Sequence, residues 1–255
     1  MIEAMIELAD PSKTEMATFF FVFLRIGAAI ALMPVFGEQT IPLRVRLALA
    51  LAFTAIVFPI SGMNFINDGS SIWMLGAAEV VNGLALGVGF RLLVFSLQIA
   101  GSIIAQSTSL SQILGSAQAE PTPAIGQLFL VSGLAIAAIL GLHVRVTHAF
   151  VFSYEMLPGG NFPSPSEITQ WGVANVARAF SLAFSLAAPF VIASFIYNVA
   201  LGVINRAMPQ LMVAMVGAPA ITLGSLALML VVAPFIISIW WNAFELYLAN
   251  PFDAH

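Results

Sequence analysis

Two long stretches without a charged residue constrain the fold of this chain more than any other feature of its sequence. Residues 179–205 and 207–244 contain no Asp, Glu, Lys or Arg, and a single arginine, Arg206, stands between them. The whole chain is 60% apolar and only 8% charged, whereas a soluble domain carries about 25% charged residues. Because such a sequence cannot cover its own surface with polar groups, it predicts an integral membrane protein or a subunit of an apolar assembly.

The apolar residues form continuous runs instead of the alternating pattern of a membrane barrel strand, which predicts an all-α fold. About six hydrophobic segments are expected, at about 13–34, 47–60, 72–105, 128–142, 170–204 and 211–248. Residues 12–15 and 164–167 have the spacing of a helix capping box. The stretch 106–127 is rich in Ser, Gln, Gly and Pro, so it is predicted to be a long loop.

The lengths of these segments do not suit six straight membrane spans. A helix needs about 20 residues to cross a hydrocarbon core of about 30 Å, and the segment 47–60 is shorter than that. The uncharged run 207–244 would measure about 57 Å as one helix. A break is therefore predicted at Gly217-Ala218-Pro219, and kinked helical hairpins are favoured.

Several charged residues lie inside apolar sequence: Arg25, Glu79, Arg91, Arg145, Glu155, Arg178 and Arg206. Each costs about 2.5–3.5 kcal/mol at the centre of a membrane helix. They are expected either to line a polar conduit and form interhelical pairs, or to lie at helix ends and reach the interface. Glu79 and Arg91 are the candidates for buried polar residues. Glu79 has no second carboxylate at helical spacing, which argues against a proton relay.

Enzymatic and nucleic-acid functions find little support in the sequence. The net charge of −4 gives no basic face, and the chain has no cysteine. His143 and His148 are five residues apart, which places them on different sides of a helix. No catalytic, cofactor-binding or metal-binding residue is predicted, and the chain is not expected to be an enzyme.

Two motifs go beyond composition. The first, RIGAAIALMPVFGEQTIPLRVR, contains in order Arg25, Pro34, Pro42, Arg44, Val45 and Arg46. The second, INRAMPQLMVAMVGAP, contains Asn205, Arg206, Pro209, Gln210, Gly217 and Pro219. Together they resemble the signatures of the FliR family, flagellar export-gate proteins whose injectisome counterparts are called SctT. We interpret these residues as an assembly or structural motif. In the second stretch, Asn205, Arg206 and Gln210 are expected to bind groups where neighbouring subunits meet, and Pro209 and Pro219 to set bends.

The resemblance implies a core subunit of a type III export gate in a bacterial inner membrane, within the flagellar basal body. Such a gate passes unfolded rod, hook and filament proteins through a larger helical assembly. The implied partners are FliP-like and FliQ-like gate subunits and FlhB-like and FlhA-like export proteins. Residues 1–157 would form a FliP-like part and residues 158–255 a FliQ-like part. No cofactor is implied.

The resemblance also places a plug inside the closed conduit, in the loop between the third and fourth segments. The candidate plug residues are Gln106, Ser109, Gln112, Gly115, Glu120, Pro121 and Pro123. Two alternatives stay open: an injectisome gate subunit of the same family, and a multi-pass secondary transporter. A transporter would predict an internal repeat and paired buried charges, and the sequence displays neither.

Overall fold

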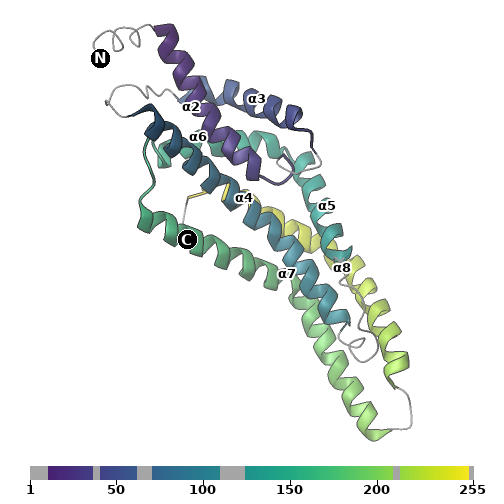
Figure 1. The fold of residues 1–255 in the computed structure, drawn as a ribbon. Coiled ribbons are helices and arrows are strands. Elements are labelled where there is room, and N and C mark those ends of the chain that lie inside the picture. The colour runs from purple at the N-terminus through teal and green to yellow at the C-terminus, as the bar shows by residue number, and fades with distance from the viewer. Residues whose placement is uncertain (1–10, 37–40, 62–70, 110–123, 209–212, 253–255) are drawn as a thin grey trace. The chain divides into compact units, whose positions relative to one another are not determined.

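The computed structural model describes residues 11–36, 41–61, 71–109, 124–208 and 213–252, and within these it contains seven helices and no strand (Figure 1). The helices are α2 (Pro11–Leu32), α3 (Leu43–Ser61), α4 (Ile72–Ser109), α5 (Ala124–Ile139), α6 (Leu142–Met156), α7 (Pro165–Ala207) and α8 (Val213–Ala249). The predicted all-α fold is confirmed.

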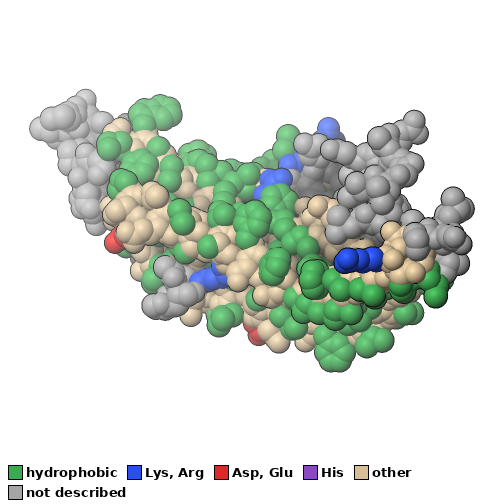
Figure 2. Space-filling view, turned by 90° about the horizontal axis from the view of Figure 1, so that it is seen from below, with side chains coloured by type: hydrophobic (Ala, Val, Ile, Leu, Met, Phe, Trp, Pro, Cys, Tyr) green, Lys and Arg blue, Asp and Glu red, His purple; other side chains and the backbone are tan. Residues whose placement is uncertain are grey.

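Five of these helices are long and apolar enough to cross a membrane. The qualifying stretches are Glu15–Leu32, Leu43–Ile60, Ile72–Ser107, Pro165–Ala207 and Pro219–Ala249, and α5 with α6 could supply a sixth span as a broken pair. Many large apolar side chains point outward, among them Phe195 at 69% and Leu230 at 82% exposure. Hydrophobic side chains dominate the described part of the face in Figure 2, and charged side chains are scattered. This surface suits lipid or apolar protein as its surroundings.

The predicted break at Gly217-Ala218-Pro219 is wrong, because α8 continues as one helix through Pro219 and Pro234. A proline removes one backbone donor from a helix, but nearby side chains can satisfy the affected backbone groups in an apolar setting. Tyr197 Oη donates to the Gly217 carbonyl at 2.9 Å, and Thr222 Oγ1 donates to the Pro219 carbonyl at 2.9 Å. Neither carbonyl is the one that loses its donor at Pro219, which in a regular helix is that of residue 215. The apolar surroundings, which favour internal backbone hydrogen bonds, are therefore the better reason for the continued helix.

The predicted loop 106–127 is shorter than expected at both ends. Helix α4 continues to Ser109 and α5 begins at Ala124, while residues 110–123 lie outside the described part of the chain. Near the end of α4, Ser102 Oγ donates to the Ile99 carbonyl at 2.7 Å and Ser107 Oγ to the Ile104 carbonyl at 2.8 Å. Because these hydroxyls bond back to their own helix, polar residues remain compatible with helical structure here.

Two local signals set the ends of other helices. Helix α7 begins at Pro165, within the capping-box spacing at 164–167, and the Ile168 amide donates to the Ser164 carbonyl at 3.0 Å. Gly141 has a backbone φ of 83°, a conformation that suits glycine and ends a regular helix. The apolar stretch that includes it is therefore divided into α5 and α6.

The chain divides into two compact units. Unit 1 comprises Met1–Leu92, Gly141–Val176 and Glu245–His255, and unit 2 comprises Leu93–Leu140 and Ala177–Phe244. The subdivision expected at residues 157 and 158 concerns likeness to two sister proteins, so it stays a prediction. In unit 1, α3 packs along α2 and also contacts α6 (Figure 1).

Unit 2 has an aromatic centre on α8. The Trp240 side chain is completely buried and stacks on Phe244, with ring centroids 5.1 Å apart. Its indole N–H donates to the Leu93 carbonyl at 2.9 Å, which satisfies the ring's only polar atom. Gly101 lies so close to Gly126 that a Cβ there would be 2.2 Å from the Gly126 Cα. These contacts hold α8 and α5 against the part of α4 that belongs to unit 2.

Val35 lies in the turn after α2 and has a backbone φ of 72°. A β-branched residue rarely adopts this left-handed conformation, which costs an L-residue about 1–2 kcal/mol. We expect Val35→Gly to raise the free energy of unfolding by about 1 kcal/mol and the melting temperature by about 2–4 °C. Thermal unfolding of the detergent-extracted protein checks this. An unchanged or lower melting temperature would contradict the conformation described for Val35.

Candidate functional site

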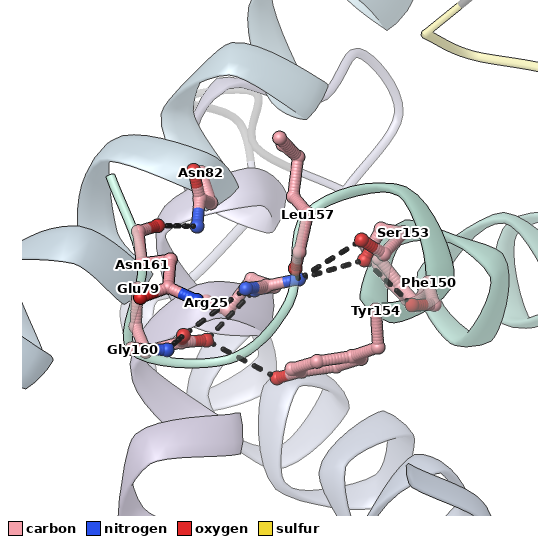
Figure 3. A network of polar contacts seen from close by, with 9 residues as sticks. All are labelled: Arg25, Glu79, Asn82, Phe150, Ser153, Tyr154, Leu157, Gly160 and Asn161. Atoms are coloured by element: carbon pink, nitrogen blue, oxygen red, sulfur yellow. Dashed lines mark hydrogen bonds and ion pairs between the residues drawn. The ribbon is translucent and has the colours of Figure 1, made fainter. Parts of the chain in front are cut away.

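Unit 1 contains an ion pair whose two side chains are completely buried. Arg25 comes from α2 and Glu79 from α4, and each side chain is 0% exposed. Arg25 Nε donates to Glu79 Oε2 at 2.7 Å, and Arg25 Nη2 donates to Glu79 Oε1 at 3.0 Å (Figure 3). This is the two-pronged geometry in which a guanidinium and a carboxylate bind most strongly.

The third nitrogen of the guanidinium binds the end of α6. Arg25 Nη1 donates to the Ser153 carbonyl at 3.2 Å, to Ser153 Oγ at 3.3 Å and to the Leu157 carbonyl at 3.0 Å. The Tyr154 ring lies 3.8 Å from the guanidinium carbon, within the range of a cation–π contact. Figure 3 shows the guanidinium between Glu79 and the α6 end, with the Tyr154 ring beside it. The arginine thus joins α2, α4 and α6.

The carboxylate has further donors of its own. The Gly160 amide donates to Glu79 Oε1 at 2.7 Å, and Tyr154 Oη donates to Glu79 Oε2 at 3.4 Å. Gly160 has a backbone φ of 77°, which glycine adopts without strain. Both carboxylate oxygens therefore have two protein donors each, so the buried charge is fully compensated within the chain.

One turn further along α4, Asn82 extends the network to the same turn. Asn82 Nδ2 donates to the Asn161 carbonyl at 3.0 Å, and the Asn82 side chain is completely buried. Its Oδ1 atom has no hydrogen-bond partner among the described residues. Asn82 and Glu79 together fasten the turn after α6 to α4.

A close crossing of α2 and α4 brings the ion pair together. A Cβ at Gly83 would lie 2.1 Å from the Arg25 carbonyl oxygen, and a Cβ at Gly87 would lie 2.7 Å from the Ala29 carbonyl oxygen. Only glycine permits the two backbones to approach this closely. The Gly83–Gly87 spacing therefore determines how deeply Arg25 can reach into the packing between the helices.

The site contains a structural ion-pair network, and the described residues contain no group of three or more His, Asp or Glu side chains placed to hold a metal ion. Comparison with known proteins shows which family the sequence matches. The family model for bacterial export proteins, family 1, matches residues 16–247.

The chain belongs to this family.

Relatives in this export family cover most of the chain. The flagellar biosynthetic protein FliR of Caulobacter vibrioides is 32% identical over 229 residues, which are 88% of this chain and 91% of that protein. The FliR protein of Bacillus subtilis is 27% identical, over 89% of this chain and 90% of its own. The Yop proteins translocation protein T of Yersinia pestis is 26% identical, over 83% of this chain and 84% of its own.

In this export-family chain, the charges singled out by sequence do not form one cluster. Arg91 was expected to be buried but is exposed on α4. The reason is its position: twelve residues separate it from Glu79, which turns it about 120° around the helix. Arg145 and Glu245 form an ion pair at 39% and 38% exposure, and Glu155 is exposed. Only Arg25 and Glu79 meet in a buried network.

The first family motif surrounds the turn between α2 and α3. Pro34 lies in the turn after α2, and Pro42 directly precedes α3. The Pro42 carbonyl accepts hydrogen bonds from the Val45 and Arg46 amides at 2.9 and 3.2 Å. Arg46 Nε donates to the Ile41 carbonyl at 3.2 Å. Arg44 is exposed.

The second family motif lies at the end of α7 and the start of α8. Asn205 and Arg206 are exposed in the last turn of α7, where a cation suits the negative end of the helix dipole. Gly217 is buried and Pro219 is exposed, both within α8. Pro209 and Gln210 lie outside the described residues.

Of the expected plug residues, Gln106 and Ser109 lie in the last turns of α4, and Gln106 is exposed. The other five, Gln112, Gly115, Glu120, Pro121 and Pro123, lie outside the described residues.

Sequence reasoning missed Ser153, Tyr154, Gly160 and Asn161 as members of the buried network. Hydroxyl and glycine residues are common in membrane helices and turns, so composition does not distinguish them. The usable signal was their position, since Ser153 and Tyr154 shortly precede the PGG turn at 158–160, and Gly160 and Asn161 lie in it or directly after it.

Proposed function

We propose that this chain is a core subunit of a type III protein export gate and helps form the conduit for unfolded flagellar rod, hook and filament proteins across the bacterial inner membrane. The single observation that carries the proposal is the family match over residues 16–247. The flagellar name of the Caulobacter relative, with 32% identity, favours flagellar use. The Yersinia relative, with 26% identity, keeps an injectisome role as the second candidate.

The geometry of the chain supports a structural role in such a gate. Arg25 and Glu79 form the one buried ion pair among the described residues. Both side chains also bond donors or acceptors of the same chain. A buried pair that is compensated within its own chain can hold helices together, and its bonded atoms are not available to bind a cargo. The pair also corrects the expectation that the sequence holds no paired buried charges, a feature that would have suited a small-solute transporter. Because Arg25 and Glu79 are already satisfied within the chain, the pair favours a structural role over small-solute transport.

The exposed surface supports assembly with other apolar chains. Helices α7 and α8 bury little of their length within the chain, and Phe180, Phe184 and Leu226 are among their exposed apolar residues. Contiguous exposed apolar surface of this kind marks a lipid or protein interface. The proposed partners are FliP-like and FliQ-like gate subunits, with FlhB-like and FlhA-like export proteins nearby.

Deletion of the gene tests the proposal. We expect the deletion strain to lose swimming motility and to stop releasing hook and filament proteins into the medium, and a plasmid copy should restore both. Retained motility with loss of other secreted effectors would assign the chain to an injectisome. Normal motility and normal secretion together would overturn the export-gate proposal.

Arg206 tests the role of the second motif. The side chains of Asn205 and Arg206 form no hydrogen bond or ion pair with the rest of the described chain, so they are available to a partner. We expect Arg206→Ala to reduce secretion of flagellar substrates about tenfold, because an interface arginine is often an energetic anchor. Arg206→Lys should retain part of the activity. A fully assembled and active Arg206→Ala gate would reduce this residue to a charge at the membrane interface.

A further inference from the structure

One side of α4 in unit 1 forms an apolar stripe that is open to the surroundings of the chain. After Trp73, the exposed residues of α4 in this unit recur every three or four positions, which places them on one side of the helix. They are Met74, Ala77, Val81, Leu84, Val88 and, at the end, Arg91. The other sides of the helix include Glu79 and Asn82, which are buried in the polar network of unit 1. The stripe therefore carries no charge before Arg91.

Trp73 stands at the beginning of this stripe and differs from the other tryptophans of the chain. Its side chain is 87% exposed, whereas Trp171, Trp240 and Trp241 are buried. Trp73 forms no side-chain hydrogen bond and no ring contact with the described residues. A tryptophan has a large apolar ring and one polar N–H, so it is favoured where hydrocarbon and water meet. The first turn of α4 thus displays a side chain typical of a membrane interface.

Arg91 ends the stripe at a distance that matches the thickness of a bilayer. Whatever else its guanidinium contacts in the chain, an exposed arginine is costly in hydrocarbon and suits the interface, where its long side chain can reach water. Eighteen positions separate Trp73 from Arg91, which is about 27 Å of helix at 1.5 Å per residue. The hydrocarbon core of a bilayer is about 30 Å thick. The whole of α4, with 38 residues, would measure about 57 Å, so only part of it can lie in that core.

We propose that this stripe of α4 faces lipid, with Trp73 at one surface of the hydrocarbon core and Arg91 at the other. The placement does not depend on the export function. A stripe in water would expose Val81, Leu84 and Val88 without any apolar neighbour. A protein partner could cover the same side chains, but it gives no reason for a tryptophan and an arginine one bilayer thickness apart.

Helix α3 of unit 1 has the same organisation. Arg44 is exposed in its first turn, and its large exposed side chains after that are apolar: Val45, Leu47, Leu51, Ile56 and Ile60. Sixteen positions separate Arg44 from Ile60, about 24 Å of helix. Because α3 and α4 follow each other in the chain, two consecutive spans place Arg44 and Arg91 at the same membrane surface, opposite Trp73. Arginines gathered on one side are typical of membrane helices.

Single cysteines along the stripe test the proposal, because the chain has no cysteine of its own. Each is labelled with a nitroxide in the full chain, which is placed in phospholipid vesicles together with cysteine-free forms of any gate subunits that co-purify. Collision of the nitroxide with oxygen, which concentrates in hydrocarbon, is compared with its collision with a water-soluble nickel chelate. The oxygen-to-nickel ratio should be about tenfold higher for Val81→Cys and Leu84→Cys than for Trp73→Cys and Arg91→Cys, because the first two lie at the centre of a core about 30 Å thick.

Ala77→Cys and Ala78→Cys are a matched pair of neighbouring positions. Ala77 is exposed on the stripe and Ala78 is buried, so the label at Ala77 should collide with oxygen and the label at Ala78 with neither reagent. Low collision with both reagents along the whole stripe would mean that another protein chain covers it, and would overturn the proposal. Frequent collision with nickel at Val81→Cys and Leu84→Cys would place the stripe in water and overturn it as well.

A water-soluble maleimide applied to native membranes gives a second measurement that needs no purification or vesicles. Thiols in hydrocarbon do not ionise and do not meet this reagent. Val81→Cys and Leu84→Cys should therefore react about tenfold more slowly than Trp73→Cys and Arg91→Cys, which lie at the edges of the core. Equal rates at the four positions would contradict the proposed placement of α4.

Discussion

Replacement of Arg25 with Leu is expected to lower the free energy of unfolding by about 3–5 kcal/mol, because it leaves the buried carboxylate of Glu79 without its cation. Glu79 would retain only the Gly160 amide and the Tyr154 hydroxyl as donors. The Ser153 and Leu157 carbonyls would lose the Arg25 donor as well. For a chain of this size the melting temperature should fall by about 10 °C. Thermal unfolding of detergent-extracted protein measures this loss.

A double-mutant cycle distinguishes the ion pair from simple loss of packing. Glu79→Leu alone should cost a similar amount, because the buried guanidinium then lacks its counter-charge. The double variant Arg25→Leu with Glu79→Leu should be more stable than either single variant, since replacing both charges with apolar groups removes their desolvation cost. Arg25→Lys should be intermediate, because an ammonium cannot form both prongs with the carboxylate. Purely additive losses would mean that the two residues do not act as a pair.

Gly83→Ala is the second change for which we expect a large effect. The added Cβ would lie 2.1 Å from the Arg25 carbonyl oxygen and 3.0 Å from the Ala28 Cβ. Backbone atoms cannot move aside as a flexible side chain can, so α2 and α4 must separate. Overpacking typically costs about 1–3 kcal/mol, and the displacement of Arg25 from Glu79 adds to it. We expect a loss of about 3 kcal/mol or more, with reduced export of flagellar substrates.

Gly172→Ala is the matched control for this prediction. Gly172 is also in unit 1 and inside a helix, α7, and no other heavy atom lies within 4 Å of its Cβ position. Alanine favours a helix over glycine by up to about 1 kcal/mol, so the control should be neutral or slightly stabilising. Equal stability of Gly83→Ala and Gly172→Ala in thermal unfolding would contradict the close crossing of α2 and α4.

The sequence predicted the fold class because the low charge and continuous apolar runs leave few alternatives to membrane helices. It also singled out Arg25 and Glu79, since a charge in an apolar segment is costly unless it has a partner. It did not pair them, because they are 54 residues apart on different helices. Spacing rules describe one helix at a time, and this pair depends on how two helices cross.

The expectations for Arg91 and for residues 217–219 were wrong because burial and helix continuity depend on a residue's surroundings as well as on the local sequence. Arg91 was expected to be buried from the length of its apolar segment, yet the side of α4 on which a residue lies also determines its burial. The Gly-Ala-Pro stretch at 217–219 was expected to break its helix, because glycine and proline destabilise helices in water. The helix α8 continues through Pro219, since apolar surroundings favour the internal hydrogen bonds of a helix.

Co-purification tests the central claim, that this chain is a core gate subunit, most directly. The tagged chain is expressed in bacterial membranes with and without the FliP-like and FliQ-like proteins encoded by the same bacterium, then extracted in mild detergent. We expect one stable complex that contains all three proteins, and aggregation or degradation of the tagged chain when the others are absent. A stable monomer that never binds either protein would contradict the account.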